Sequence, residues 1–194
     1  MSIKKIILFA SGAGSNVENI VRYFADNPLV AISVVLTNNK NAKVIERCNK
    51  LKVNALYFNK HAFTGSTCVL ELIKEMNPDL IVLAGFLWKI PEDIVAAFPN
   101  KIINIHPALL PKYGGKGMYG MHVHQAVKAQ EEVETGITIH YVNDKYDEGA
   151  VINQVATTIT LEDSAATIAK KVQELERQHF PKTIERLLFP EKGN

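Results

Sequence analysis

The sequence has few of the features that mark specialised classes of protein. Only two cysteines, Cys48 and Cys68, occur among 194 residues, which excludes a disulfide framework and any CxxC metal or redox motif. The 22 basic and 20 acidic residues give a net charge of +2, too little for an electrostatic nucleic-acid interface. No apolar run approaches the length of a membrane span. We therefore expect a reducing, cytoplasmic setting, with neither nucleic acid nor membrane as a partner.

What remains is an ordinary globular composition, with 47% hydrophobic and 22% charged residues. A chain of this length buries roughly 70% of its unfolded surface, so it needs no disulfide or metal in order to fold. We predict a single domain over residues 1–194, without internal repeats or linkers.

Apolar strand-like runs alternate with helical patterns in the first half of the chain. The predicted strands are Lys5–Ala10, Ala31–Leu36, Ala55–Phe58, Leu80–Ala84 and Ile102–Ile105. Helices are predicted after the first three strands, from about Val17, at Ala42–Leu51 and at Thr67–Met76. Repeated strand–helix units of this kind pair their strands in parallel. The predicted fold class is therefore α/β, with a doubly wound, mostly parallel sheet and helices on both faces.

The pattern changes after His106. Residues 107–120 hold two prolines and four glycines without usable periodicity, and a loop of this length inside a domain is usually functional. Beyond it we predict a helix, two paired strands and a long C-terminal helix, at Met121–Ala129, Gly136–Asn143, Ala150–Thr158 and about Ser164–Leu188. Asp163 or Ser164 is the expected N-cap of the long helix.

A glycine-rich segment, Ser11–Asn16, lies between the first strand and the first helix. Glycines let the backbone approach a ligand, and a helix N-terminus offers unpaired N–H groups that favour an anion, most often phosphate. The segment is not a dinucleotide fingerprint, because Val17 stands where a small residue is needed and the second strand ends in Leu36-Thr-Asn-Asn rather than an acid. A phosphate monoester site therefore fits better, with a plain tight turn as the alternative.

Asn104 and His106 point the same way, because side chains alternate along a strand. They lie at the carboxyl end of a buried strand, where open α/β sheets bind ligands. Asn can donate to a developing oxyanion, and His can move a proton near neutral pH. Asp147, in the polar turn 143–149, would raise the pKa of a neighbouring histidine. A structural hydrogen-bonded pair and a solvated turn carboxylate are the alternatives.

Taken together, five segments resemble the folate-dependent phosphoribosylglycinamide formyltransferases. In chain order these are Ser11–Asn16, Val82–Leu87, Asn104–Pro111, Gly136–His140 and Asp147–Ile152. Their order and spacing match the family over nearly the whole chain. Methionyl-tRNA formyltransferases share the catalytic strings but lack the glycine-rich loop and carry an extra C-terminal domain, and formyltetrahydrofolate deformylases carry an extra N-terminal domain. The resemblance implies one formyltransferase domain that acts in purine biosynthesis as a monomer or homodimer.

The resemblance also implies individual roles. Asn104 would stabilise the oxyanion, His106 would be the catalytic histidine, and Asp147 would hold the pKa of His106 above its ordinary value and orient a water. The residues implied for phosphoribosylglycinamide are Gly14, Ser15, Asn16 and Glu176. Those implied for the cosubstrate 10-formyltetrahydrofolate are Leu87, Trp88, Lys89, Ile90, Asn104, Asn143, Asp144 and Asp147. No metal is expected.

Four positions depart from the family pattern. Ala108 stands where the family usually has serine, which removes one hydroxyl. An arginine that commonly contacts the folate tail is missing near Ser66. Trp88 and Lys89 replace a more usual Arg-Ile pair, so we expect Lys89 to supply the missing charge.

Two other classes of function stay open at this point. His122 and His124, with His106 and Asp147, could form a His/carboxylate zinc site of a metal-dependent hydrolase. A non-enzymatic module that binds a phosphorylated ligand is the other alternative, although it leaves the Asn, His and Asp arrangement without a purpose.

Overall fold

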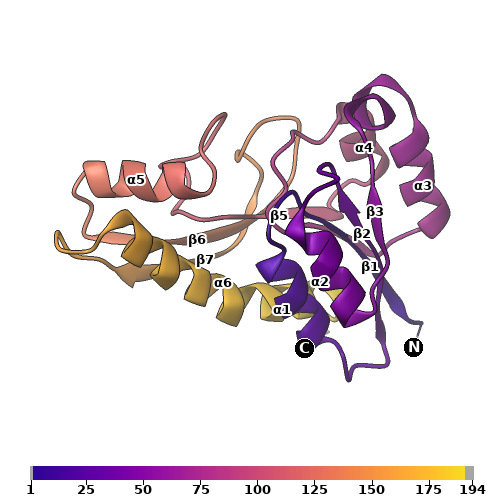
Figure 1. The fold of residues 1–194 in the computed structure, drawn as a ribbon, viewed down its shortest axis with the longest axis horizontal. Coiled ribbons are helices and arrows are strands. Elements are labelled where there is room, and N and C mark those ends of the chain that lie inside the picture. The colour runs from indigo at the N-terminus through magenta and orange to yellow at the C-terminus, as the bar shows by residue number, and fades with distance from the viewer. Residues whose placement is uncertain (1, 191–194) are drawn as a thin grey trace. The chain divides into compact units, whose positions relative to one another are not determined.

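The computed structural model describes residues 2–190 and contains a seven-stranded sheet in the order β3-β2-β1-β4-β5-β6-β7 (Figure 1). The strands are β1 (Lys4–Phe9), β2 (Val30–Thr37), β3 (Ala55–Tyr57), β4 (Leu80–Leu83), β5 (Ile102–His106), β6 (Glu134–Tyr141) and β7 (Val151–Thr158). β1 pairs in parallel with β2 and β4, β2 pairs in parallel with β3, and β6 and β7 are antiparallel. The predicted fold class, a mostly parallel α/β sheet, is confirmed.

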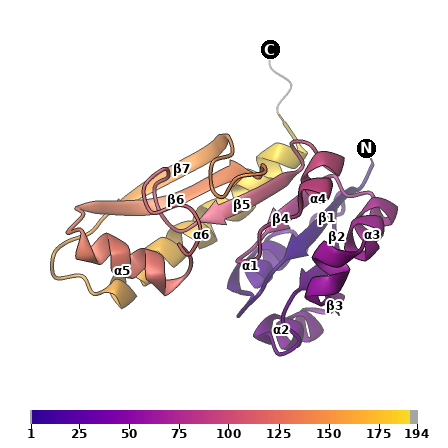
Figure 2. The ribbon, with the colours of Figure 1, turned by 90° about the horizontal axis from the view of Figure 1, so that it is seen from above.

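The described residues divide into two compact units, the first comprising residues 2–103 and 188–190 and the second comprising residues 104–187. In the first unit the helices are α1 (Ser15–Tyr23), α2 (Lys43–Leu51), α3 (Cys68–Met76) and α4 (Glu92–Ala97), with a π-helix, η1 (His61–Gly65). α1 and α2 cover one face of the strands, and α3 and α4 cover the other (Figure 2). The central strands are therefore buried on both faces, which explains their continuous apolar runs.

Two elements of the first unit, η1 and α4, were not predicted. They are five and six residues long, and each buries one residue, Phe63 and Ile94 respectively. An element this short shows too few buried positions to establish a helical period. The other predicted strands and helices of this unit are present close to their expected bounds.

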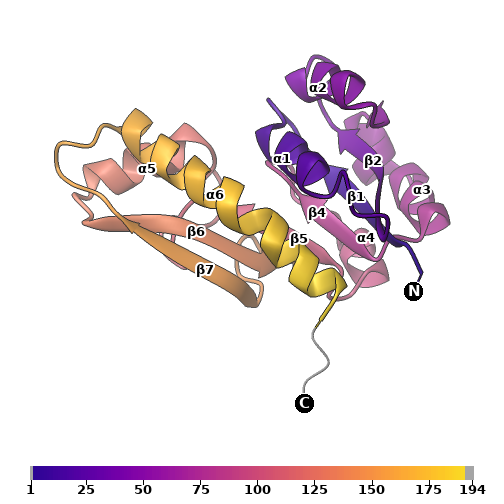
Figure 3. The same ribbon diagram turned by 90° about the horizontal axis from the view of Figure 1, so that it is seen from below.

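The second unit contains the end of β5, the β6–β7 pair, α5 (Met121–Ala129) and α6 (Ala165–Leu188). α6 runs along one face of the strands (Figure 3), and α5 lies over the opposite face (Figure 1). Of the two expected caps for α6, Ser164 is the one used, since its Oγ accepts from the N–H of Thr167 at 3.1 Å. The turn between β6 and β7 carries Asp147 and brings it to the strand end that bears His106. The prediction of a single domain over residues 1–194 stays a prediction.

Candidate functional site

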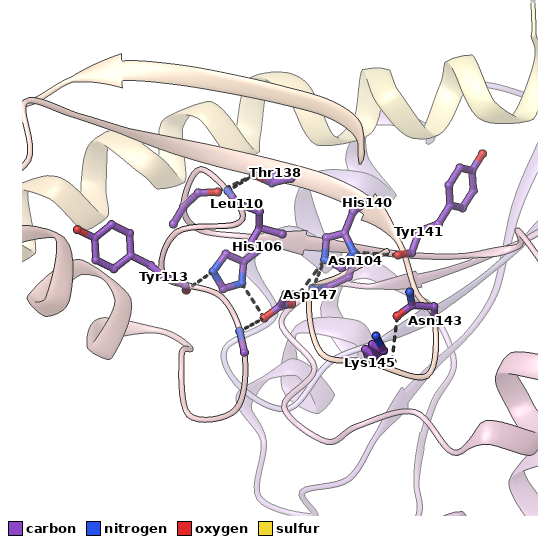
Figure 4. A network of polar contacts seen from close by, with 12 residues as sticks. Asn104, His106, Leu110, Tyr113, Thr138, His140, Tyr141, Asn143, Lys145 and Asp147 are labelled. Carbon is purple, nitrogen blue, oxygen red and sulfur yellow. Dashed lines mark hydrogen bonds and ion pairs between the residues drawn. The ribbon is translucent and has the colours of Figure 1, made fainter. Parts of the chain in front are cut away.

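Four polar side chains of the second unit converge at the end of β5 (Figure 4). Asn104 and His106 lie on β5, His140 lies on β6, and Asp147 lies in the turn that follows β6. The side chain of His106 is 4% exposed and that of Asp147 is 12% exposed. Strand alternation predicts that Asn104 and His106 share a face of β5. In the structure both belong to a cluster of side chains that is largely withdrawn from solvent.

Both ring nitrogens of His106 face an oxygen. Its Nε2 lies 2.8 Å from the backbone carbonyl oxygen of Tyr113, and its Nδ1 lies 3.5 Å from Oδ2 of Asp147. A carbonyl oxygen only accepts, so Nε2 carries a proton and donates it to Tyr113. In the neutral ring Nδ1 therefore keeps its lone pair and is the nitrogen able to accept a proton beside the carboxylate.

The pKa of His106 corrects one expectation from the sequence. Burial lowers this pKa, and it outweighs the Asp147 carboxylate and the Tyr113 carbonyl, which both raise it. The contribution of Asp147 has the expected direction, but the prediction that the net pKa lies above the ordinary value is wrong. The sequence does not reveal how completely the strand end is covered. The resting imidazole is consequently neutral near pH 7.

Asp147 stays ionised despite its burial. Burial raises the pKa of this carboxyl, but its contact with His140, its electrostatic interaction with His106 and the hydrogen bond from the N–H of Gly115 (2.8 Å) together hold the pKa below its ordinary value. The residue adopts a left-handed conformation with φ 56°. Aspartate tolerates this conformation better than bulkier residues do, which suits it to the turn.

His140 fixes the orientation of Asn104, a role that the sequence did not assign. Its Nδ1 donates to the carbonyl oxygen of Tyr141 at 2.9 Å, and its Nε2 lies 3.1 Å from the amide nitrogen of Asn104. With Nδ1 as the donor, Nε2 is the nitrogen left to accept one amide hydrogen of Asn104, and the second amide hydrogen stays available for another acceptor. His140 occurred in a family string, but only the pairing of neighbouring strands shows what it contacts.

The start of the loop after β5 is held by Thr138 of β6. Its hydroxyl donates to the carbonyl of Ala108 at 2.7 Å and accepts from the N–H of Leu110 at 3.0 Å. The side chain of Ala108 is fully buried. A serine at this position would bring a buried hydroxyl that needs a hydrogen-bond partner.

In the first unit, the glycine-rich segment has a backbone tied to α2. The carbonyl of Gly12 accepts from the N–H of Val44 at 3.1 Å, and that of Ala13 accepts from Nε of Arg47 at 2.9 Å. Gly14 is left-handed with φ 74°, and no side chain caps α1. The first-turn N–H groups of α1, which include Ser15 and Asn16, are the donors that this geometry offers to an anion. Arg47 was not identified from the sequence, where nothing connects it with this loop.

The segment Leu87–Ile90 follows β4 and is joined to the same loop. The N–H of Leu87 donates to Oγ of Ser11 at 2.9 Å. Trp88 packs against Phe58, Phe63 and Phe86, with ring centroids 5.9 to 6.4 Å apart. Lys89, the expected replacement charge, lies 3.8 Å from Glu92 in an exposed pair. The segment thus combines an aromatic ring packed against three others with a backbone held beside the glycine-rich segment.

The remaining predicted residues belong to the second unit. Asn143 accepts from the N–H of Lys145 at 2.9 Å and so shapes the turn that carries Asp147, while Asp144 is exposed. Glu176 is half-buried on α6.

Within residues 2–190 the structure brings together no group of three His, Cys, Asp or Glu side chains able to hold a metal ion. The helices of this part of the chain include none long and apolar enough to cross a membrane.

An amide donor, a neutral imidazole and a carboxylate at the end of a parallel strand can stabilise an oxyanion and move a proton, which are the requirements of acyl transfer. The chain matches the family model described as formyl transferase over residues 4–184, and it belongs to that family.

Similar proteins indicate which kind of formyl transferase the chain resembles. The phosphoribosylglycinamide formyltransferase of Bacillus subtilis is 36% identical, over 96% of this chain and 95% of that protein. The chloroplastic enzyme of Arabidopsis thaliana is 35% identical, over 98% of this chain and 69% of that protein. The crystal structure of the Anaplasma phagocytophilum enzyme superposes with a TM-score of 0.86 at 28% identity, over 96% of this chain and 88% of that one. The resemblance to phosphoribosylglycinamide formyltransferases is therefore confirmed.

Proposed function

We propose that the chain transfers the formyl group of 10-formyltetrahydrofolate to the amino group of phosphoribosylglycinamide. The products are formylglycinamide ribonucleotide and tetrahydrofolate, and the reaction is a step of de novo purine biosynthesis. The single observation that carries the proposal is the buried cluster of Asn104, His106, His140 and Asp147 at the end of β5. The similarity to enzymes of that name supports the choice of substrates.

Asn104 would stabilise the charge that develops on the formyl oxygen as the amine attacks the formyl carbon. Its amide nitrogen is already oriented by His140 at 3.1 Å, so the second amide hydrogen needs no reorganisation before it donates. An amide donor aimed at charge that is present only in the transition state lowers the barrier without tightening ground-state binding.

His106 would carry the proton. The amine loses a proton as the carbon–nitrogen bond forms, and Nδ1 of neutral His106 accepts it through a water that Asp147 orients. The imidazolium so formed lies 3.5 Å from the Asp147 carboxylate, which stabilises it. The same nitrogen then returns the proton to the folate nitrogen as the bond between the formyl carbon and that nitrogen breaks.

Binding roles complete the proposal. Gly14, Ser15 and Asn16 would hold the substrate phosphate through N–H groups at the start of α1, and Glu176 would contact the rest of phosphoribosylglycinamide. The folate would contact the segment Leu87–Ile90, and Asn143 and Asp144 beside Asp147. No resident metal is required by these steps. We further propose a cytoplasmic location and a monomer or homodimer, and the free thiols of Cys48 and Cys68 support a reducing setting.

The proposal is tested by mixing the purified chain with both substrates and following tetrahydrofolate release. Tetrahydrofolate should form in proportion to phosphoribosylglycinamide, and it should not form when an aminoacylated tRNA or water alone is offered as acceptor. Release that is independent of phosphoribosylglycinamide would instead indicate a deformylase.

A further inference from the structure

Tyr113 connects His106 with a charged pair that lies outside the cluster. Its backbone carbonyl accepts from His106 Nε2, while its phenolic hydroxyl donates to Oε1 of Glu132 at 2.8 Å. Lys112 contacts the same carboxylate oxygen at 2.9 Å. Figure 4 shows the carbonyl of Tyr113 facing His106 and its ring directed away. One residue thus contacts the histidine through its main chain and the carboxylate through its side chain.

The conformation of Tyr113 requires an anchor. Its φ of 57° lies in the left-handed region, which is unfavourable for a bulky residue. Two glycines follow, and the second, Gly115, has φ 94° and donates its N–H to Asp147 at 2.8 Å. The three-residue segment 113–115 therefore supplies the acceptor for His106 and a donor for Asp147. Because glycines leave this segment free to adopt other conformations, the contacts of Tyr113 and Gly115 select this one, and the phenol of Tyr113 supplies one of those contacts.

We propose that Glu132 is a positioning residue for formyl transfer: by holding the phenol of Tyr113, it keeps the Tyr113 carbonyl on Nε2 of His106 and so makes Nδ1 the nitrogen that takes and returns the proton. The inference rests on the role proposed above for His106. Glu132 touches neither the reacting atoms nor His106, and it acts through Tyr113.

The protonation states of Tyr113 and Glu132 preserve the hydrogen bond between them near neutral pH. Burial, then the hydrogen bond and charge of Glu132, raise the pKa of Tyr113 to about 12, so the phenol remains a donor. Hydrogen bonds from Lys112 and Tyr113 lower the pKa of Glu132, so the carboxylate remains an acceptor. A bond between a neutral donor and a charged acceptor is stronger than one between neutral groups.

The pair lies at the wall of a cavity of about 260 Å³, which is also lined by Leu109, Leu110, Pro111, Glu134, Thr135 and Gln154. Substitutions of Tyr113 or Glu132 therefore remove their hydrogen bond without leaving a void in the closed core. This makes the contact testable by variants that fold.

The test compares Tyr113→Phe and Glu132→Ala, which break the contact, with Glu132→Gln, whose amide oxygen still accepts from the phenol. Glu131→Gln, which changes the adjacent exposed carboxylate, is the matched control. Steady-state rates give kcat and KM for both substrates. Nitrogen NMR of protein labelled at its histidine rings reports which nitrogen of His106 is protonated and at what pH.

We expect Tyr113→Phe and Glu132→Ala each to lower kcat about tenfold, the value of one hydrogen bond, with both KM values within about twofold. The pKa of His106 should fall, because the Tyr113 carbonyl raises it. In these two variants the neutral ring of His106 should no longer exist only as the tautomer that is protonated on Nε2. Glu132→Gln should stay near the parent enzyme, and the double variant Tyr113→Phe with Glu132→Ala should lose no more than either single variant.

An unchanged His106 spectrum and kcat in both disrupting variants would overturn the proposal. So would an equal loss in Glu131→Gln, or multiplied losses in the double variant. If His106→Ala keeps its turnover, the function proposed for His106 fails instead. The spectra of the Tyr113 and Glu132 variants test the role of Glu132 independently of that result.

Discussion

Asp147→Asn isolates the charge of Asp147 from its shape. The asparagine is nearly isosteric, it tolerates the left-handed φ of 56°, and its amide oxygen can still accept from the N–H of Gly115. What is lost is a negative charge 3.5 Å from Nδ1 of His106. An opposite charge within this range shifts a pKa by about 1 to 3 units. The carboxylate raises the pKa of His106, so its removal lowers a value that burial has already depressed.

The shift in the pKa of His106 also sets the expected loss of rate. Each pKa unit corresponds to about 1.4 kcal/mol, so the imidazolium formed during the reaction becomes about tenfold to a thousandfold less accessible. We expect kcat to fall within that range, with little change in KM for phosphoribosylglycinamide. The assay combines a pH titration of His106 by nitrogen NMR with steady-state formyl transfer, and Glu148→Gln, which changes an exposed carboxylate of the same turn, is the control. An unchanged titration of His106 in Asp147→Asn, or the same shift in Glu148→Gln, would refute the reasoning.

Three further outcomes follow from single residues. In Gly14→Val, a Cβ would lie 2.4 Å from Cγ2 of Val44 at a φ of 74°, so KM for phosphoribosylglycinamide should rise, about tenfold or more, while KM for the folate stays within about twofold; equal weakening of both would contradict the phosphate assignment. In Gly149→Ala, a Cβ would lie 1.7 Å from the Tyr141 carbonyl that holds His140, so kcat should fall and thermal unfolding should report a loss of about 1 to 3 kcal/mol. Burial lowers the pKa of both His106 and His124, so the unfolded chain binds more protons than the folded one and the free energy of unfolding falls as the pH drops below about 6.5. Urea unfolding of His124→Leu should show a weaker pH dependence, and an equal dependence would show that His124 does not contribute.

Most of the fold could be predicted because hydrophobic pattern and layer structure agree. Strands buried on both faces give continuous apolar runs, and β1 and β4 were found for that reason. Asn104 and His106 could be placed on one face from strand alternation alone. Asp147 could not, because a carboxylate in a polar turn looks solvated unless the partner strand is known, and its role came from the resemblance.

The features that could not be predicted depend on contacts between distant residues. His140 acquires its role because β6 lies next to β5, and Tyr113 contributes a backbone carbonyl, a group that every residue has. The sign of the His106 pKa shift depends on a side chain that is only 4% exposed. No motif specifies that degree of burial, so the carboxylate alone suggested the opposite sign.

The most direct measurement of the central claim is the single-turnover rate of formyl transfer to phosphoribosylglycinamide in Asn104→Ala, His106→Ala and the double variant, with the exposed His122→Ala as control. The account predicts losses of about 100- to 1,000-fold for the amide donor and about 100- to 10,000-fold for the histidine. Because both act in one transition state, the double variant should lose far less than the product of the two, and His122→Ala should transfer at the parent rate. A near-parent rate in His106→Ala, or losses that multiply in the double variant, would contradict it.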